Sequence, residues 1–218
     1  MRGSNTVIYA IIIVLIILIT VAVLYKLGFF EGTIQPSGGE NTSTITALSG
    51  SGENIKILNS PPNAIPNGVY YWNWDLGAFV RVNTSGSTAY IPRESGYYLY
   101  YFHNNQCPHC TAFEPKLLQY LKTPSVANEF KSKLNIVLIA CSWFEVQCDD
   151  PVAKATFHAF NIMSSPTLLL IKISNGSIEK IIDVTSVYVD LMRQGKIPAT
   201  QEIEPQYIFL IIKANIES

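Results

Sequence analysis

The chain has 218 residues, a formal net charge of −1 and a charged fraction of 14%, well below the roughly 25% of an average globular protein. It carries no basic patch and no run of like charges, which excludes nucleic acid as an expected partner. Four cysteines, all in the C-terminal part, fit an oxidising compartment.

The first element in chain order is the apolar run over residues 6–25, which contains no charged residue. A helix of this length spans about 30 Å, the thickness of a bilayer core. A cleaved signal peptide is the alternative, but its apolar region is usually only about 7 to 15 residues, and no A-x-A-like cleavage site follows. We therefore predict a single-pass transmembrane anchor over residues 1–30.

The orientation of this anchor has to be inferred from features beyond it, because Arg2 and Lys26 give only a slight charge bias. Three N-x-S/T glycosylation acceptors, at Asn41, Asn83 and Asn175, matter only in a secretory or cell-surface context. Together with the even number of cysteines, they favour a cytoplasmic N-terminus and an extracytoplasmic location for the rest of the chain.

Residues 31–66 are rich in Gly, Ser, Thr and Asn, a composition that does not bury enough apolar surface to order itself. We predict a flexible linker that holds the following domain roughly 30 Å from the membrane. Residues 67–218 are long enough to form one folded domain with a sizeable hydrophobic core.

The folded part is predicted to open with a β-hairpin over residues 69–90, where short aromatic and β-branched runs are separated by turn signals. Trp72 and Trp74 alternate with polar residues in this hairpin. We expect these indoles to pack in the core, with an aromatic platform for substrate as the alternative.

The remaining elements alternate between strand and helix, which predicts an α/β domain with a βαβ unit and an added antiparallel pair at Asn175-Gly176. The last segment is continuously apolar and reads equally as a helix or an edge strand. The expected elements are strand 97–102, helix 111–121, a turn at 126–130, strand 134–140, helix 150–160, strands 167–173 and 178–184, helix 186–194, and the ambiguous segment 206–215.

The motif with the clearest chemistry is Cys107-Pro108-His109-Cys110, at a predicted strand-to-helix turn. Disulfide exchange needs an accessible thiolate to attack and a second thiol to resolve the mixed disulfide. Cys107 stands where helix amides stabilise a thiolate, and Cys110 is the resolving sulfur one turn inside. His109 would stabilise the reduced form and make the disulfide more oxidising, while Pro108 suits the first helical position.

A fixed structural disulfide and a metal site are the alternatives for this pair. A metal needs about four ligands, and the sequence has no second C-x-x-C and only His103 and His158 as further histidines. We expect no metal and no dissociable cofactor, and we assign His103 and His158 structural roles.

Residues 96–184 resemble the thioredoxin superfamily: strand, C-x-x-C, helix, strand, helix, then Pro-Thr before a strand and hairpin. The run that ends in Ser165-Pro166-Thr167-Leu168-Leu169-Leu170 is similar to the family's I-P-T-L-L-L stretch. The resemblance implies a thioredoxin-like fold, a central mixed sheet flanked by helices. It also implies a cis peptide before Pro166, packed against the active disulfide, and a Ser165 backbone that pairs with an extended substrate chain.

The Pro-His dipeptide within the motif is that of the periplasmic thiol oxidases of the DsbA type, which favours oxidation over reduction. Two residues depart from the thioredoxin pattern, Gln106 in place of Trp and Tyr101 in place of a buried acid. Without that acid, the proton route from Cys110 lacks an obvious acceptor. The large helical insert of the DsbA type is absent as well.

The second cysteine pair, Cys141 and Cys148, closes a short loop at the end of a predicted strand. A structural disulfide is the expected state, worth roughly 2.5 kcal/mol on the chain-entropy model. A redox relay with Cys107 is the alternative, because a thioredoxin-like sheet would bring the two strand ends to one edge.

The sequence therefore predicts a membrane-anchored, extracytoplasmic thiol-disulfide oxidoreductase that oxidises or isomerises disulfides in secreted or membrane proteins. Its expected partners are cysteine-containing protein substrates, the membrane and a membrane redox partner. The alternatives are a reductase fed by a membrane electron carrier, as in cytochrome maturation, and a non-catalytic tethered binding or assembly module.

Overall fold

The computed structural model describes residues 65–217 of the chain. The predicted anchor over residues 1–30, and all of the linker before residue 65, lie outside the described residues. Within residues 65–217 the longest helices are too short or too polar to span a bilayer.

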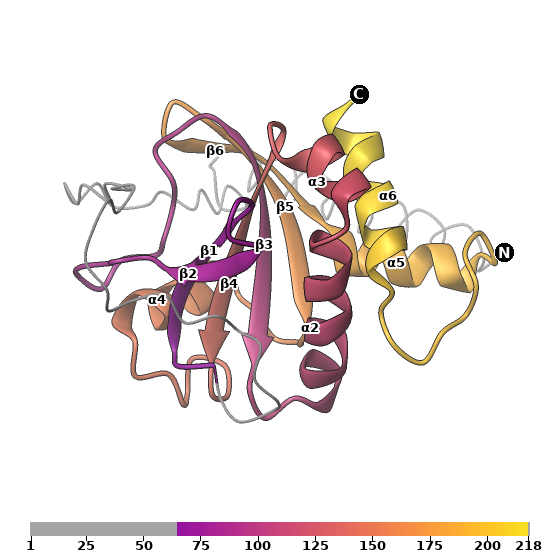
Figure 1. Ribbon diagram of the computed structural model, residues 1–218. Coiled ribbons are helices and arrows are strands. Elements are labelled where there is room, and N and C mark those ends of the chain that lie inside the picture. Colours follow the sequence, from indigo (N-terminus) through magenta and orange to yellow (C-terminus); the bar gives the residue numbers. More distant parts are fainter. Residues whose placement is uncertain (1–64, 218) are drawn as a thin grey trace, which may run out of the picture. The chain divides into compact units, whose positions relative to one another are not determined.

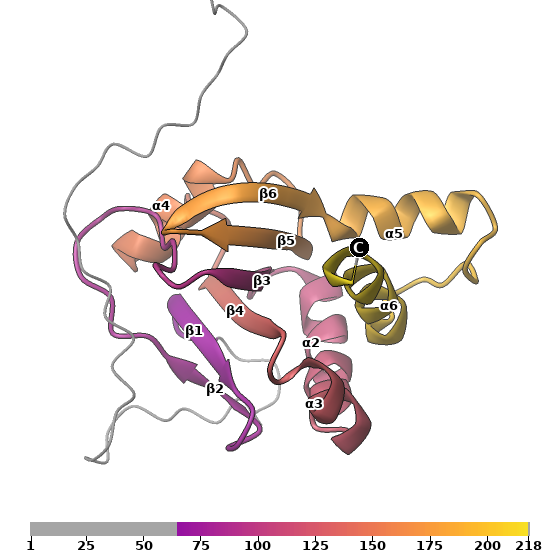
Figure 2. The same cartoon turned by 90° about the horizontal axis from the view of Figure 1, so that it is seen from above.

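The centre of the domain is a six-stranded mixed sheet in the order β2-β1-β4-β3-β5-β6 (Figures 1 and 2). Strands β3 and β4 run parallel, and every other neighbouring pair is antiparallel. The strands are β1 (Gly68–Asn73), β2 (Ala78–Arg81), β3 (Gly96–Asn104), β4 (Leu134–Cys141), β5 (Thr167–Ser174) and β6 (Ser177–Asp183).

Helices cover both faces of this sheet, α4 on one face and the other four on the opposite face. A hydrophobic core lies on each face of the sheet, and successive side chains of β3 point into one core and then the other. Leu99 and Tyr101 pack toward α2, whereas Tyr100 and Phe102 pack toward α4. The helices are α2 (Pro108–Leu121), α3 (Pro124–Phe130), α4 (Pro151–Ala159), α5 (Val184–Arg193) and α6 (Pro205–Ile216).

The last segment, for which helix and edge strand were equally open, is the helix α6. Its buried residues Ile208, Phe209, Ile211 and Ile212 recur with helical spacing, while Leu210 between them is 60% exposed. Pro205 at the first turn also fits a helix start, since proline lacks the amide that would have no partner there.

The predicted N-terminal hairpin is present as β1 and β2, with its turn at residues 74–77. Strand β1 also pairs with β4, so the hairpin extends the main sheet. Trp72 is fully buried and contacts Phe79, so core packing is correct for this indole. The second hairpin turns at Asn175-Gly176, and both residues have positive φ as a two-residue type I′ turn requires.

The element order β3-α2-α3-β4-α4-β5-β6-α5, with β3 between β4 and β5 in the sheet, is a thioredoxin-like arrangement with the short helix α3 added after α2. The α/β class and the central mixed sheet are thus as predicted. Helix α2 starts at Pro108, three residues before the expected start, which places the C-x-x-C motif within the first helical turn.

Candidate active site

The topology brings the two sequence motifs to one edge of the sheet. Parallel strands β3 and β4 both end there, and the chain leaves β3 through Asn105 and Gln106 to reach Cys107. Because β5 runs antiparallel to β3, with Thr167 opposite Phe102, the segment that enters β5 lies at the same edge. Pro166 therefore meets Cys107, although 58 residues separate Cys107 from Ser165.

Cys107 is the N-cap residue of α2, and its sulfur lies 3.2 Å from the backbone oxygen of Ser165. The Ser165–Pro166 peptide is cis, as the resemblance implies. The expectation of a well-exposed thiol is wrong for this structure: Cys107 retains only 7% of its surface. The Ser165 turn covers it, in line with the packing of the Pro166 peptide against the cysteine pair that the resemblance implies.

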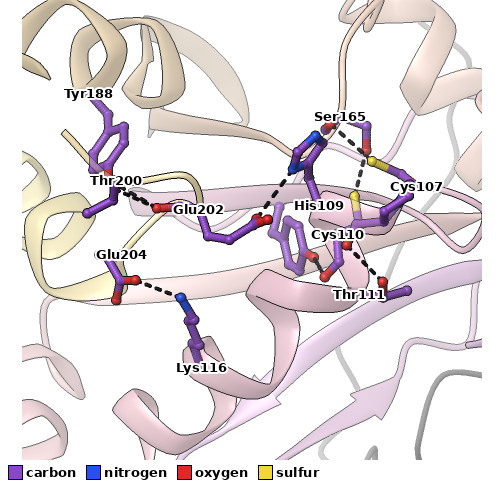
Figure 3. A network of polar contacts seen from close by, with 12 residues as sticks. Cys107, His109, Cys110, Thr111, Lys116, Ser165, Tyr188, Thr200, Glu202 and Glu204 are labelled. Carbon is purple, nitrogen blue, oxygen red and sulfur yellow. Dashed lines mark hydrogen bonds and ion pairs between the residues drawn. The ribbon is translucent and has the colours of Figure 1, made fainter. Parts of the chain in front are cut away.

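Cys110 lies behind Cys107 and is completely buried. Its sulfur lies 2.7 Å from the Ser165 hydroxyl (Figure 3). The same sulfur lies 3.5 Å from the backbone nitrogen of Asn104. Burial raises the pKa of the Cys110 thiol to about 12, an effect that the hydrogen bonds from Asn104 and Ser165 oppose. This asymmetry, a more accessible sulfur at the helix start and a buried one behind it, fits an attacking and a resolving thiol.

Tyr101 and His103 form a buried polar pair next to Cys110. The Tyr101 hydroxyl lies 2.9 Å from His103 Nδ1 and 3.4 Å from the Cys110 carbonyl oxygen. Burial lowers the pKa of His103 to about 4, so its ring is neutral near pH 7. His103 is buried and hydrogen-bonded, which fits the structural role assigned to it, and Tyr101 occupies the place of the family's acid.

His109 is exposed and points from α2 toward the segment between α5 and α6, where its Nδ1 lies 3.3 Å from Glu202 Oε2 (Figure 3). In the described part of the chain, no polar contact joins the His109 ring to Cys107. The sequence analysis missed Glu202, since nothing in the sequence indicates that the segment after α5 returns to the motif.

Two polar contacts hold the segment between α5 and α6 in place. Lys116 of α2 pairs with Glu204 at 2.6 Å, and Thr200 bonds the Tyr188 hydroxyl at 2.8 Å (Figure 3). A cavity of about 530 Å³ lies between this segment, α5 and the turn at Pro166. It is lined by His109, Ser164, Ser165, Pro166, Thr185, Ser186, Val189, Asp190, Arg193, Gln201, Glu202 and Ile203.

Glu114 is a second residue that the sequence analysis missed. It follows Cys110 by one helical turn, and burial raises the pKa of its carboxyl to about 7. Its charge acts on Tyr101, whose pKa is raised well above the usual value, mainly by burial. The region behind Cys110 therefore contains an acid after all, but on the helix and not on β3.

Cys141 and Cys148 form a disulfide at the end of β4. The register places Cys141 opposite Asn104, and the Asn105 amide donates to the Cys141 carbonyl at 3.0 Å. The disulfide-closed loop thus borders the strand end that carries the C-x-x-C motif. His158, in contrast, is an exposed residue on α4 that pairs with Glu145 of this loop at 2.8 Å.

Metal coordination needs three or more clustered ligands. Among the described residues 65–217, no such group of His, Cys, Asp or Glu side chains is found.

The domain is thioredoxin-like by strand order, helix placement and position of the dithiol, and these features point to thiol-disulfide chemistry. Among solved structures, thioredoxin from Aeropyrum pernix is similar at 19% identity, with a TM-score of 0.34 over 60% of this chain and 95% of that one. Neither a protein-family model nor a curated relative matches the sequence.

Proposed function

We propose that the chain is a thiol-disulfide oxidoreductase that acts on cysteine-containing proteins through Cys107 and Cys110. The observation that carries this proposal is the placement of the Cys107 sulfur at the start of α2, 3.2 Å from the Ser165 carbonyl, with free Cys110 buried directly behind it. Both sulfurs contact Ser165, so the residue before Pro166 lies where an approaching disulfide has to pass.

The exchange starts when Cys107 and a client sulfur form a mixed disulfide. Cys110 then attacks the Cys107 sulfur, a Cys107–Cys110 bond forms, and the client leaves as a thiolate. Run in reverse, the same steps transfer the disulfide from the enzyme to the client. Pro166 and Ser165 would hold the client chain in an extended form beside the dithiol, with the adjacent cavity available to its side chains.

Mixed-disulfide trapping tests this function. In the full-length Cys110→Ala variant, client proteins should remain linked to Cys107 and appear as high-mass bands on non-reducing gels that disappear on reduction. The matched control is Cys107→Ala, which keeps Cys110 but should trap nothing, because Cys110 is fully buried. If both variants behave alike, the catalytic proposal is wrong and a tethered binding module becomes the better account.

We further propose the oxidising direction, in line with the Pro-His dipeptide of the DsbA type. The reduction potential of the Cys107/Cys110 couple decides between directions, because strong oxidants lie near about −120 mV and thioredoxin near about −270 mV. Equilibration of the full-length chain with glutathione buffers measures it. A value near the thioredoxin end would favour the reductase fed by a membrane carrier.

Membrane anchoring and an extracytoplasmic location complete the proposal. The uncharged run over residues 6–25 supports an anchor, and the acceptor sites Asn83 and Asn175 both lie on exposed positions. Two results are expected: retention in the membrane fraction after alkaline washing, and labelling of Cys107 in intact cells by a membrane-impermeant thiol reagent. Release by the wash, or labelling only after lysis, would contradict the anchor or the location.

A further inference from the structure

The hydroxyl of Tyr101 occupies an unusual place for a tyrosine. The side chain is completely buried, its ring packs edge-to-face against Phe113 and His103, and its oxygen lies 3.4 Å from the Cys110 carbonyl. The titratable groups around it are Cys107, Cys110 and Glu114 from α2 and His103 from β3.

The orientation of the hydroxyl hydrogen follows from its neighbours. The Asn105 side-chain nitrogen donates to the Ile65 carbonyl at 2.8 Å, which turns the amide oxygen of Asn105 toward His103 Nε2 at 3.2 Å. His103 therefore carries its proton on Nε2, and its Nδ1 accepts from Tyr101 at 2.9 Å. In the resting dithiol, the Tyr101 hydrogen is thus directed at His103.

We propose that Tyr101 is a further catalytic residue, whose hydroxyl swings from His103 Nδ1 to donate a hydrogen bond to the Cys110 sulfur whenever that sulfur is a thiolate. Burial is the main cause of the raised pKa of Tyr101, and the nearby charge of the Cys110 thiolate raises it further. The hydroxyl lies beside Cys110, 3.4 Å from its carbonyl oxygen, and rotation about the tyrosine C–O bond turns the hydrogen away from His103. His103 is a positioning residue that accepts the hydrogen while Cys110 is a neutral thiol.

Burial explains why the donor is needed. The Cys110 sulfur has no exposed surface, so water does not solvate the negative charge that appears on it. In the resolving step, Tyr101 donates to the Cys110 sulfur as its proton leaves, and the thiolate attacks Cys107. The Cys107–Cys110 bond forms, the bond to the client breaks, and the client thiolate takes up the proton that Cys110 lost. In reverse, Tyr101 stabilises Cys110 as the leaving thiolate.

Cys110 is also the thiol on which the buried acid of the thioredoxin family acts, but the acid acts on it in a different manner. A carboxylate in that position accepts the proton of the resolving thiol, whereas burial raises the pKa of Tyr101 so far that it stays protonated and only donates. This inference rests on the proposed function, because it assigns a role within the same exchange reaction.

The resolving step can be isolated in the full-length chain with dithionitrobenzoate. The reagent first forms a mixed disulfide on Cys107, and Cys110 then expels the second coloured thiolate, whose release gives the rate. In Tyr101→Phe we expect this release to slow by about tenfold or more, since hydrogen bonds to charged groups are among the strong ones. Tyr101→Phe should also reach the wild-type release rate only at a pH about one unit higher.

Tyr100→Phe is the matched control. It removes an equally buried hydroxyl that bonds the Tyr90 carbonyl on the opposite face of β3, so its release rate should stay within twofold of wild type. Equal slowing in Tyr100→Phe, or no slowing in Tyr101→Phe, overturns the proposal.

Failure of this inference is distinguishable from failure of the proposed function. If the wild-type chain forms no mixed disulfide at Cys107, or never releases the second thiolate, the oxidoreductase proposal itself is wrong. If the wild type completes both steps at the same rate as Tyr101→Phe, only the role of Tyr101 is wrong.

Discussion

Glu202 and His109 form a hydrogen-bonded contact across the active site, with Oε2 and Nδ1 3.3 Å apart, although 93 positions separate them in the sequence. The contact directs the exposed imidazole of the C-x-x-C motif toward the α5–α6 segment (Figure 3). The histidine that was expected to serve Cys107 is therefore shared with a carboxylate.

We predict that Glu202→Gln makes Cys107 more reactive. The change frees the His109 ring to approach the sulfur and removes a negative charge from the mouth of the site. Alkylation of Cys107 by iodoacetamide should become about two to five times faster at low ionic strength, with a smaller gain in high salt. Glu204→Gln, which breaks the neighbouring pair with Lys116, is the matched control and should have a smaller effect. A slower reaction in Glu202→Gln would refute this account.

Ser165 provides a second prediction, because its hydroxyl and its carbonyl contact different sulfurs. The hydroxyl lies 2.7 Å from Cys110 and lowers the pKa of that thiol, so Ser165→Ala should raise the pKa and slow the resolving step about threefold to tenfold. The backbone contact to Cys107 remains, so alkylation of Cys107 should change little. Ser164→Ala is the control, since the Ser164 hydroxyl bonds Thr167 and neither sulfur. Equal rates in both variants would count against the assignment.

Most of the fold follows from local sequence signals, and these signals are strong for physical reasons. The runs that form β3, β4 and β5 are apolar on both faces because helices cover both faces of the sheet. Asn175-Gly176 predicts its hairpin because both turn positions need a positive φ. The Cys107 and Pro166 motifs meet because parallel and antiparallel pairing around β3 leaves no other edge for them.

The parts that were missed depend on contacts between distant segments. His109 is paired with Glu202, which comes from a segment with no regular sequence pattern. Glu114 looks like an ordinary polar helix residue, and only tertiary burial raises its pKa to about 7. The N-terminal turn could not be located from the sequence because several Gly and Asn signals compete there, and strand pairing selects residues 74–77.

Burial of His103 predicts a specific dependence of stability on pH. Its pKa is about 6.5 in the unfolded chain and about 4 in the fold, so the unfolded state binds more protons between these values. This contribution to stability is fully present above about pH 6.5 and is lost as the pH falls toward 4, by about 3 kcal/mol.

Urea unfolding of wild type and His103→Leu at several pH values measures this contribution. The variant should show a shallower loss of stability between pH 6.5 and 4, because leucine does not titrate. His158→Leu is the matched control, since His158 is exposed and its removal should leave the wild-type slope in place. Parallel curves for wild type and His103→Leu would show that His103 is not the responsible group.

The last prediction separates the two roles considered for the second cysteine pair. Replacement of Cys141 and Cys148 by alanine opens a loop with a sequence separation of 7, which should lower the free energy of unfolding by about 2.5 kcal/mol on the chain-entropy model. If the disulfide is structural, the folded double variant should still oxidise a reduced client peptide at a rate close to wild type. A redox relay would instead abolish repeated turnover while leaving the first exchange at Cys107 intact, since the electrons would then have no exit through Cys141. Single-turnover and multiple-turnover rates, measured on the same full-length protein below its unfolding midpoint, distinguish these outcomes.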